Sequence, residues 1–234
     1  SLLAKQANDN AIAWILAHQA GLTAQGCKAS AGSRFDIDTP VDLLVAHRHP
    51  DLGPHLREYL DELGWTSPQL DGVLVEMARE GGNLMVAGRA SSAAWSSLER
   101  GTHCWVRVVA EERGMRASGR QKRGEVRSLL ADYLAFVGVE GFFEALSELT
   151  NAVLLDNRVI LASRNLWPPT LDRFNSDLHR WAEVEEPFLR RRARAAAEAP
   201  IPVVMGGHSV VAGGLMALTE SLQTGHPTAR EEST

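Results

Sequence analysis

Two aspartates, Asp36 and Asp38, alternate with the apolar residues Phe35 and Ile37 near the start of the chain. In an extended segment, successive side chains point to opposite faces, so the two carboxylates are expected on one face and the two apolar side chains on the other. Carboxylates at the end of a strand are suitable ligands for a divalent cation and, through it, for a phosphate. The pattern therefore predicts a strand end at which Asp36 and Asp38 hold magnesium.

The residues that follow predict the start of a helix. Thr39 is a typical N-cap, Pro40 suits the first helical position, and Asp42 stands where a capping box places an acid. The alternative interpretation of the whole run is a well-capped turn from strand to helix, whose acids are simply solvated. The residues alone favour neither interpretation.

The run Phe35–Leu44 also resembles the end of the catalytic domain in nucleotidyltransferases of the molybdenum-cofactor guanylyltransferase type, a group that includes the 2-phospholactate guanylyltransferases. In that family an acidic or amide pair is followed by Thr-Pro-x-Asp-Leu. Asn8–Asn10 at a helix start and Ala20–Leu22 fit the preceding part of the pattern, so the resemblance covers about residues 1–50.

The resemblance implies that Asp36 lies near a metal and the phosphates, with Asp38 beside it. The glycine-rich Leu-Ala-Gly-Gly loop that holds the nucleotide in the family, and the metal-binding Asp in the middle of its domain, have no counterpart in this sequence. Residues 1–65 are therefore expected to form only the last part of such a domain.

Composition limits the class of protein. The 234 residues are 44% hydrophobic and 23% charged, as in an ordinary globular protein, and the net charge of −5 argues against a general nucleic-acid-binding protein. No apolar run is long enough to cross a membrane, and no signal peptide is visible, so a cytoplasmic protein is expected. Cys27 and Cys104 lack the spacing of metal ligands.

Beyond Gly64–Pro68, which has the composition of a linker, short apolar runs alternate with amphipathic ones. Strands interleaved with helices predict an α/β fold: a mostly parallel wound sheet with helices on both faces, preceded by the partial nucleotidyltransferase-like segment. The expected division is 1–65 for that segment, 68–225 for the wound α/β domain and 226–234 for a disordered tail.

The expected strands are 84–87, 104–109, 151–161 (bent at a turn) and 201–205, and the expected helices are 10–20, 40–49, 52–63, 93–98, 125–149, 173–181, 186–199 and 215–222.

The sequence after the last expected strand is the best candidate for an anion site. Gly206 and Gly207 allow a tight turn, and free N–H groups at the start of a helix attract an anion. Ser209 could donate to the same anion, and His208 could donate to it or act as an acid or base. The alternative is a plain turn from strand to helix, with Ser209 as N-cap and His208 exposed.

Two further strand ends carry residues that suit an anion. Arg89 follows the first strand, with Ser91 and Ser92 where a helix begins, although a plain cap is the commoner role for such serines. Arg113 and Arg116 follow the second strand and could close over a phosphate. The alternative is a solvated loop with scattered arginines.

Asp156 at the third strand end could bind magnesium or a ribose hydroxyl, or could form an Asx-turn with Asn157. Downstream, Arg173 could join an anion pocket, whereas Asp177 is interpreted as the partner of a neighbouring residue. The basic run Arg190–Arg194 is interpreted as a solvated face or a subunit contact. In the second case the protein would be a homo-oligomer.

Two functions are therefore expected to compete. The first is a nucleotidyltransferase-related protein, magnesium-dependent if it is an enzyme, whose α/β domain binds a phosphorylated small molecule or a nucleotide at the carboxyl ends of its strands. The second is a non-catalytic module that binds a small anion or another protein. Neither interpretation involves nucleic acid or a membrane.

Overall fold

The computed structural model describes residues 12–224, except for the side chain of Thr224, and its centre is a parallel β-sheet. The four strands lie in the order β2-β1-β3-β4 and all pair in parallel. Their bounds are β1 Asn83–Gly88, β2 Trp105–Ala110, β3 Ala152–Asp156 and β4 Val203–Gly206. The expected α/β fold with a parallel sheet is confirmed.

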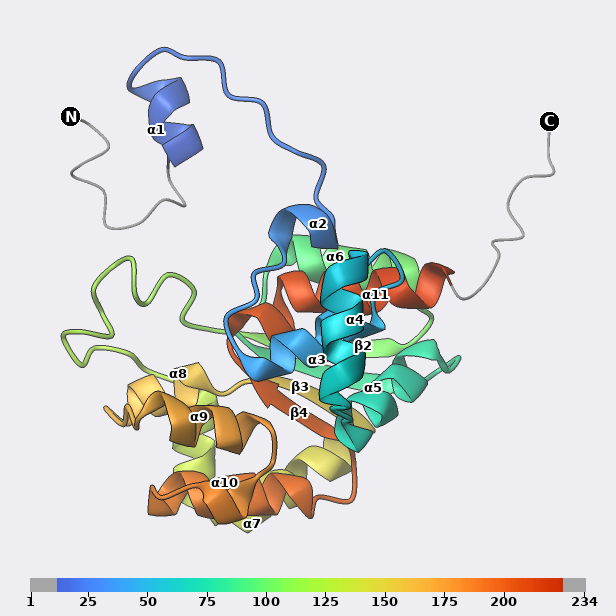
Figure 1. Ribbon diagram of the computed structural model, residues 1–234. Coiled ribbons are helices and arrows are strands. Elements are labelled where there is room, and N and C mark those ends of the chain that lie inside the picture. Colours follow the sequence, from blue (N-terminus) through green and yellow to red (C-terminus); the bar gives the residue numbers. More distant parts are fainter. Residues whose placement is uncertain (1–11, 225–234) are drawn as a thin grey trace.

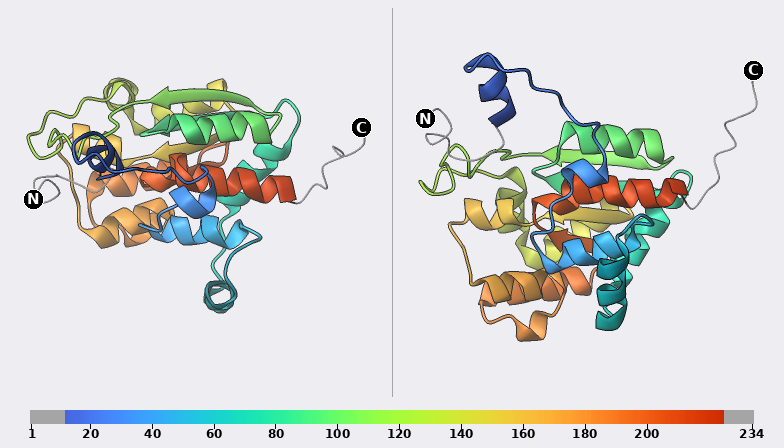
Figure 2. Two further views of the ribbon diagram at one scale, coloured as in Figure 1. Left: turned by 90° about the horizontal axis from the view of Figure 1, so that it is seen from above. Right: turned by 45° about the horizontal axis from the view of Figure 1, so that its top comes forward.

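Helices cover both faces of the sheet (Figures 1 and 2). The helices are α1 Ile12–His18, α2 Ala31–Arg34, α3 Pro40–Arg48, α4 Pro54–Leu63, α5 Pro68–Ala78, α6 Ser92–Gly101, α7 Leu129–Leu149, α8 Arg158–Ser163, α9 Thr170–Asp177, α10 Pro187–Ala197 and α11 Gly213–Thr224, with short 3₁₀ helices η2 Trp181–Glu183 and η3 His208–Val211. No helix within residues 12–224 is long and apolar enough to cross a membrane.

Alternation along the strands divides the core into two layers. Leu84 and Leu154 pack on one face of the sheet with α3, α5, α6 and α11, whereas Met85 and Val153 pack on the other face with α7 and α10. Burial on both faces explains why β1, β3 and β4 are almost continuously apolar, as is usual for parallel sheets, whereas the edge strand β2 is only partly buried and contains Arg107. A kink at Gly138, where φ is +80°, interrupts α7.

The segment before residue 65 shares this core. Val41, Leu44 and Val45 of α3 belong to the same buried cluster as Leu84 and Leu154 of the sheet. The expected boundary at residues 65–68 therefore does not separate two cores. Helix α3 packs on the sheet as part of the wound domain. Helix α1, by contrast, lies apart from the rest of the molecule at the end of an extended connection (Figures 1 and 2).

Three local expectations were wrong. Residues 35–38 are extended but pair with no strand within the described chain. Asp36 and Asp38 therefore lie in a loop and not at the end of a strand. Residues 158–161 belong to helix α8, because β3 ends at Asp156. The last two residues of the expected linker begin helix α5, because Ser67 is its N-cap and Pro68 is its first residue. The expected helix start at Asn8–Asn10 and the tail 226–234 lie outside the described residues.

Candidate functional site at the carboxyl edge of the sheet

The carboxyl ends of the four strands meet at one edge of the sheet. Gly88 pairs with Ala110, and Asp156 pairs with Gly206, so the residues that follow all four strands lie side by side. After β1 the chain adds β2 on one side of it, and later adds β3 and β4 on the other side. In open α/β sheets, ligands bind outside the carboxyl ends at this change of direction, which here lies between β1 and β3.

An ion pair occupies this point. The Arg89 guanidinium contacts Asp156 with both ends, Nε to Oδ2 at 2.5 Å and Nη2 to Oδ1 at 3.0 Å, and the Asp156 side chain is fully buried. The backbone N–H of Arg89 also donates to Asp156 Oδ2. Gly88 makes this approach feasible, because its φ is +118° and a Cβ there would lie 2.5 Å from the Asp156 Cβ.

The pair decides what Asp156 can bind in this arrangement. Its carboxylate already faces a guanidinium, so the place that a cation would take is filled by Arg89. The expected magnesium ligand therefore does not fit a metal as placed here, and Arg89 presents less free charge to an anion than the sequence suggested. Within residues 12–224, no group of three or more His, Cys, Asp or Glu side chains is placed to hold a metal ion.

A second buried pair lies next to the first. The Arg158 Nη1 donates to Asp177 Oδ1 at 3.0 Å and its Nη2 donates to Asp177 Oδ2 at 2.5 Å, while the Asn157 side chain donates to the same carboxylate at 2.7 Å. The backbone N–H of Arg158 donates to Asp156 Oδ1, which links the two pairs. The sequence interpretation gave Arg158 no role in the site, because it placed residues 151–161 in one bent strand.

Asp42 is the buried acid of the capping box that begins α3. Its Oδ2 accepts from the backbone N–H groups of Asp38 and Thr39 and from the Thr39 hydroxyl, which confirms the expected cap. Its Oδ1 is buried and has no hydrogen-bond partner among the described residues. Burial raises the pKa of Asp42 to about 6 against these hydrogen bonds. Asp36 and Asp38 themselves are exposed.

The turn after β4 differs from the expectation. Gly206 and Gly207 lead into the four-residue 3₁₀ helix η3, and α11 begins only at Gly213. The start of α11 is covered, because a Cβ on Gly213 would lie 2.1 Å from the carbonyl oxygen of Arg34. The Ser209 hydroxyl donates to the carbonyl of Asp36 at 2.7 Å. The expectation that an α-helix begins directly after Gly207 was therefore wrong, because a 3₁₀ helix occupies this position.

His208 stays exposed on this edge and has charged neighbours from other strand ends. Partial desolvation lowers the pKa of its imidazole, and the positive charges of Arg89 and then Arg113 lower it further, against the carboxylates of Asp156 and Asp36. Arg89, Arg113 and His208 therefore share one electrostatic environment, although they come from three separate segments.

The serines after β1 act in the helix that follows. The Ser91 Oγ accepts from the backbone N–H of Ala94 at 3.1 Å and caps α6, and Ser92 is the first residue of that helix. Ser91 therefore has the commoner role of a helix N-cap.

The long connection between β2 and α7 carries the exposed arginines. Arg113 and Arg116 are exposed, and their guanidinium groups make no hydrogen bond or ion pair to any described residue. Burial first, then the charge of Arg158 and the weaker effect of Arg116, lowers the pKa of Arg173, which places Arg116 near the second ion pair. Met115 packs with Val126 and Ala162, which anchors the connection on α8.

Backbone strain marks the start of the same connection. Glu112 has a φ of +58°, a conformation that residues other than glycine rarely adopt. Glu111 beside it accepts from the Ser128 hydroxyl at 2.6 Å and from the backbone N–H of Leu129, so it holds the start of α7. Glu111 therefore ties the residues after β2 to the start of α7.

Comparison of the chain with family models, with curated proteins and with solved structures found no match.

Proposed function

We propose that the carboxyl edge of the sheet binds a phosphorylated small molecule or a nucleotide, with Arg113, Arg116 and His208 as the groups that contact the phosphate. The observation that carries the proposal is the convergence of positive side chains at the β1–β3 change of direction. Two of them, Arg113 and Arg116, have no partner within the described chain, so they are free to pair with a phosphate.

The buried ion pairs have a separate role in this proposal. Arg89 and Arg158 are held by Asp156 and Asp177, so they position the strand ends and contribute little net charge. The charge that attracts the ligand then resides on the exposed connection between β2 and α7. A phosphate monoester with two negative charges would match two unpaired guanidinium groups.

The relation to nucleotidyltransferases stays part of the proposal and rests on the run Phe35–Leu44. Magnesium would enter this site with the phosphate ligand, and its protein ligand would be Asp36, an exposed carboxylate in the electrostatic environment of His208. The residues present do not form a metal site without that ligand.

One observation favours the alternative, a non-catalytic module that binds a small anion. Asp156 is occupied by Arg89, and the exposed Asp36 and Asp38 have no third carboxylate in place among residues 12–224. Phosphate binding that does not depend on magnesium would support this alternative over a magnesium-dependent transferase.

Thermal unfolding in the presence of inorganic phosphate, AMP or GMP tests the proposal. A ligand that binds only the folded chain raises Tm with its concentration. We expect this rise for the wild type and its loss in the double variant Arg113→Ala/His208→Ala. Titrations with and without MgCl₂, and with Asp36→Asn, separate the two alternatives.

Arg100→Ala is the matched control, because Arg100 is exposed at the far end of α6, on the opposite edge of the sheet. It should keep the full rise in Tm. Equal stabilisation of the wild type and the double variant, or no stabilisation of the wild type by any of the three compounds, would overturn the proposal.

A further inference from the structure

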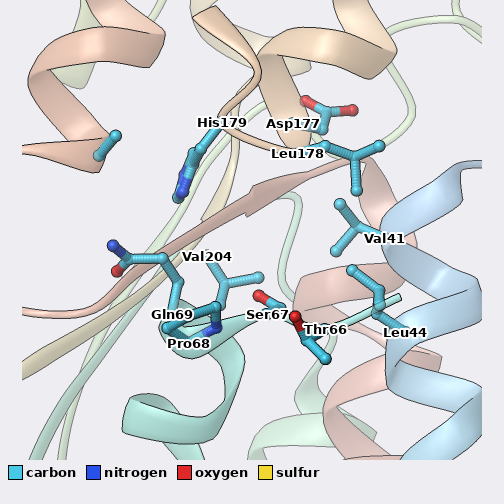
Figure 3. Close-up of a pocket in the computed structure, with 11 residues that line it drawn as sticks. Val41, Leu44, Thr66, Ser67, Pro68, Gln69, Asp177, Leu178, His179 and Val204 are labelled. Atoms are coloured by element: carbon cyan, nitrogen blue, oxygen red, sulfur yellow. The ribbon is translucent and has the colours of Figure 1, made fainter. Parts of the chain in front are cut away.

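A cavity of about 190 Å³ lies beside β4, and Asp177, the partner of Arg158, is among the residues that line it (Figure 3). Because β4 is an edge strand, no further strand within residues 12–224 covers this side of it. Segments from five parts of the chain surround the space: α3, the start of α5 with the two residues before it, the end of α9 with the turn after it, the end of α10, and β4 itself.

Part of the wall is apolar. Val41 and Leu44 of α3, Leu178 after α9 and Val204 of β4 line one side and the back of the cavity (Figure 3). All four also belong to, or pack against, the hydrophobic core on this face of the sheet. The cavity is therefore held by the core and is not a gap between exposed loops.

The opposite part of the wall carries hydrogen-bonding groups. His179 and Gln69 line one side of the cavity, and Thr66 and Ser67, which directly precede α5, line another part of the wall (Figure 3). The Nε2 atom of His179 is buried and has no hydrogen-bond partner among the described residues. Gln69 uses its carbonyl oxygen to accept from the Val203 N–H at 2.8 Å, which leaves its amide N–H groups as donors.

The conformation of His179 is unusual as well. Its φ is +58°, in the left-handed region, and this places the imidazole against the cavity. A strained residue with an unsatisfied buried nitrogen destabilises the folded state, because the nitrogen has lost its hydrogen bonds to water without gaining others. A ligand that pairs with this nitrogen would recover that free energy.

The cavity is close to electrically neutral. No Lys or Arg occurs among the described residues that line it, and the carboxylate of Asp177 is already paired with Arg158. Burial lowers the pKa of His179 to about 4, so the imidazole is uncharged near pH 7 and offers one donor and one acceptor. These groups suit an uncharged ligand and disfavour an ion.

The volume limits the size of that ligand. At roughly 30 Å³ for each water in the liquid, the cavity has room for about six water molecules. That space suits one small ring system and is too small for a nucleotide with its sugar and phosphates.

We propose that this cavity is a second binding site, which takes an uncharged heteroaromatic ring of nucleobase size between Val41, Leu44 and Val204, with its polar edge toward His179 and Gln69. Such a ring combines apolar faces with alternating donors and acceptors, as the wall does. The inference does not depend on phosphate binding at the arginine edge.

Calorimetric titration of the full chain with adenine, cytosine, uracil and hypoxanthine tests the inference. At least one base should bind saturably. Thr66→Trp places bulk at the exposed mouth of the cavity and should weaken that binding at least tenfold, whereas Glu62→Trp puts the same side chain on an exposed part of α4 and should leave it unchanged.

His179→Asn is the second variant, because asparagine tolerates a positive φ but cannot reach as far as the imidazole. It should also weaken binding, and in the wild type the ring signals of His179 should shift on titration in an NMR spectrum. The inference is wrong if none of the four bases binds saturably, or if Thr66→Trp and His179→Asn bind as tightly as the wild type.

Nucleoside 5′-monophosphates identify the source of the ring. If the base belongs to a nucleotide that also reaches the arginine edge, the monophosphate should bind more tightly than its base, and Arg113→Ala/His208→Ala should remove only that gain. If base and monophosphate bind equally well, the ligand of the cavity is a free heterocycle. Base binding that survives in this double variant keeps the second site separate from the first.

Discussion

At the scale of single residues, Asp42 and His179 are two buried titratable groups with opposite responses to pH. Asp42 has a pKa of about 6 in place of 3.8, and His179 has a pKa of about 4 in place of 6.5, both mainly because of burial. Each group is therefore held in its neutral form more strongly in the folded chain than in the unfolded chain.

The two shifts act on stability in opposite directions. The folded chain binds a proton at Asp42 more tightly than the unfolded chain, so the free energy of unfolding falls as pH rises from about 3.8 to about 6. The folded chain binds a proton at His179 less tightly, so the free energy of unfolding falls as pH drops from about 6.5 to about 4. Between pH 4 and 6 the two effects largely cancel in the wild type.

Single variants should separate the two effects. In Asp42→Asn, only the pH dependence that His179 contributes should remain. The free energy of unfolding of this variant should therefore drop on acidification from pH 6.5 to 4. In His179→Asn, only the pH dependence that Asp42 contributes should remain. The free energy of unfolding of this variant should therefore rise on acidification from pH 6 to 4. A shift of about two pKa units corresponds to roughly 3 kcal/mol at most. Urea denaturation at half-unit steps of pH measures both slopes, and parallel curves for the two variants would contradict the assignment.

At the scale of elements, α11 determines how the segment before residue 65 is attached. Its first residue, Gly213, lies against the backbone of Arg34 and Phe35, so closely that an added Cβ would lie only 2.1 Å from the Arg34 carbonyl oxygen. Helix α11 also packs on α2, α3 and α6, so this contact joins early and late parts of the chain (Figure 1).

Gly213→Ala should therefore destabilise the protein. In most helical positions Gly→Ala is stabilising by about 0.5–1 kcal/mol, so a change of sign would report the close backbone contact. Gly141→Ala in α7 is the control, because a Cβ there would meet its nearest neighbour, Val137, at an ordinary 3.5 Å. Thermal unfolding compares the two variants, and equal effects would show that the contact at Gly213 does not matter.

Helix boundaries were predictable where capping residues mark them, and less so elsewhere. Thr39, Pro40 and Asp42 start α3 as expected, because the local cap is sufficient to specify the turn. Residues 158–161 were misassigned, since Val, Ile and Leu in succession suit a buried strand and a buried helix equally. Ser67 and Pro68 had the same cap-and-proline signature as Thr39 and Pro40, but the flanking Gly64 and Trp65 favoured a linker.

The candidate site was predictable in its position but not in its pairings. Polar residues after each strand follow from the sequence, because parallel strands end at one edge. The pairing of Arg89 with Asp156, and of Arg158 with Asp177, depends on the order of strands and on where α9 packs. No local pattern encodes either, so Asp156 was interpreted as a metal ligand.

At the scale of the whole molecule, the segment before residue 65 is part of the folded unit. Val41, Leu44 and Val45 close the core over the sheet, whereas α1 lies apart from it (Figure 2). The two parts of the segment should therefore respond differently to truncation.

A chain that begins at residue 29 should keep the circular dichroism and the cooperative unfolding of the full chain. A chain that begins at residue 68 should lose cooperative unfolding, because it exposes the apolar surface that α3 covers. Two independently folding units, with cooperative unfolding of the chain from residue 68, would instead support a boundary at residues 65–68.

The all-parallel sheet also governs how the chain reaches this structure. Asn83 pairs with Trp105, Leu84 with Ala152 and Val153 with Val203, so strand partners are 22, 68 and 50 residues apart. No strand can form a hairpin with its successor, and every pairing must first close a long loop at an entropic cost. Strand β1 waits longest for its second partner, since β3 is synthesised 68 residues later. During synthesis, apolar β1 stays half-paired until α7 and β3 have emerged, which makes this interval the stage at which the nascent chain is most prone to aggregate.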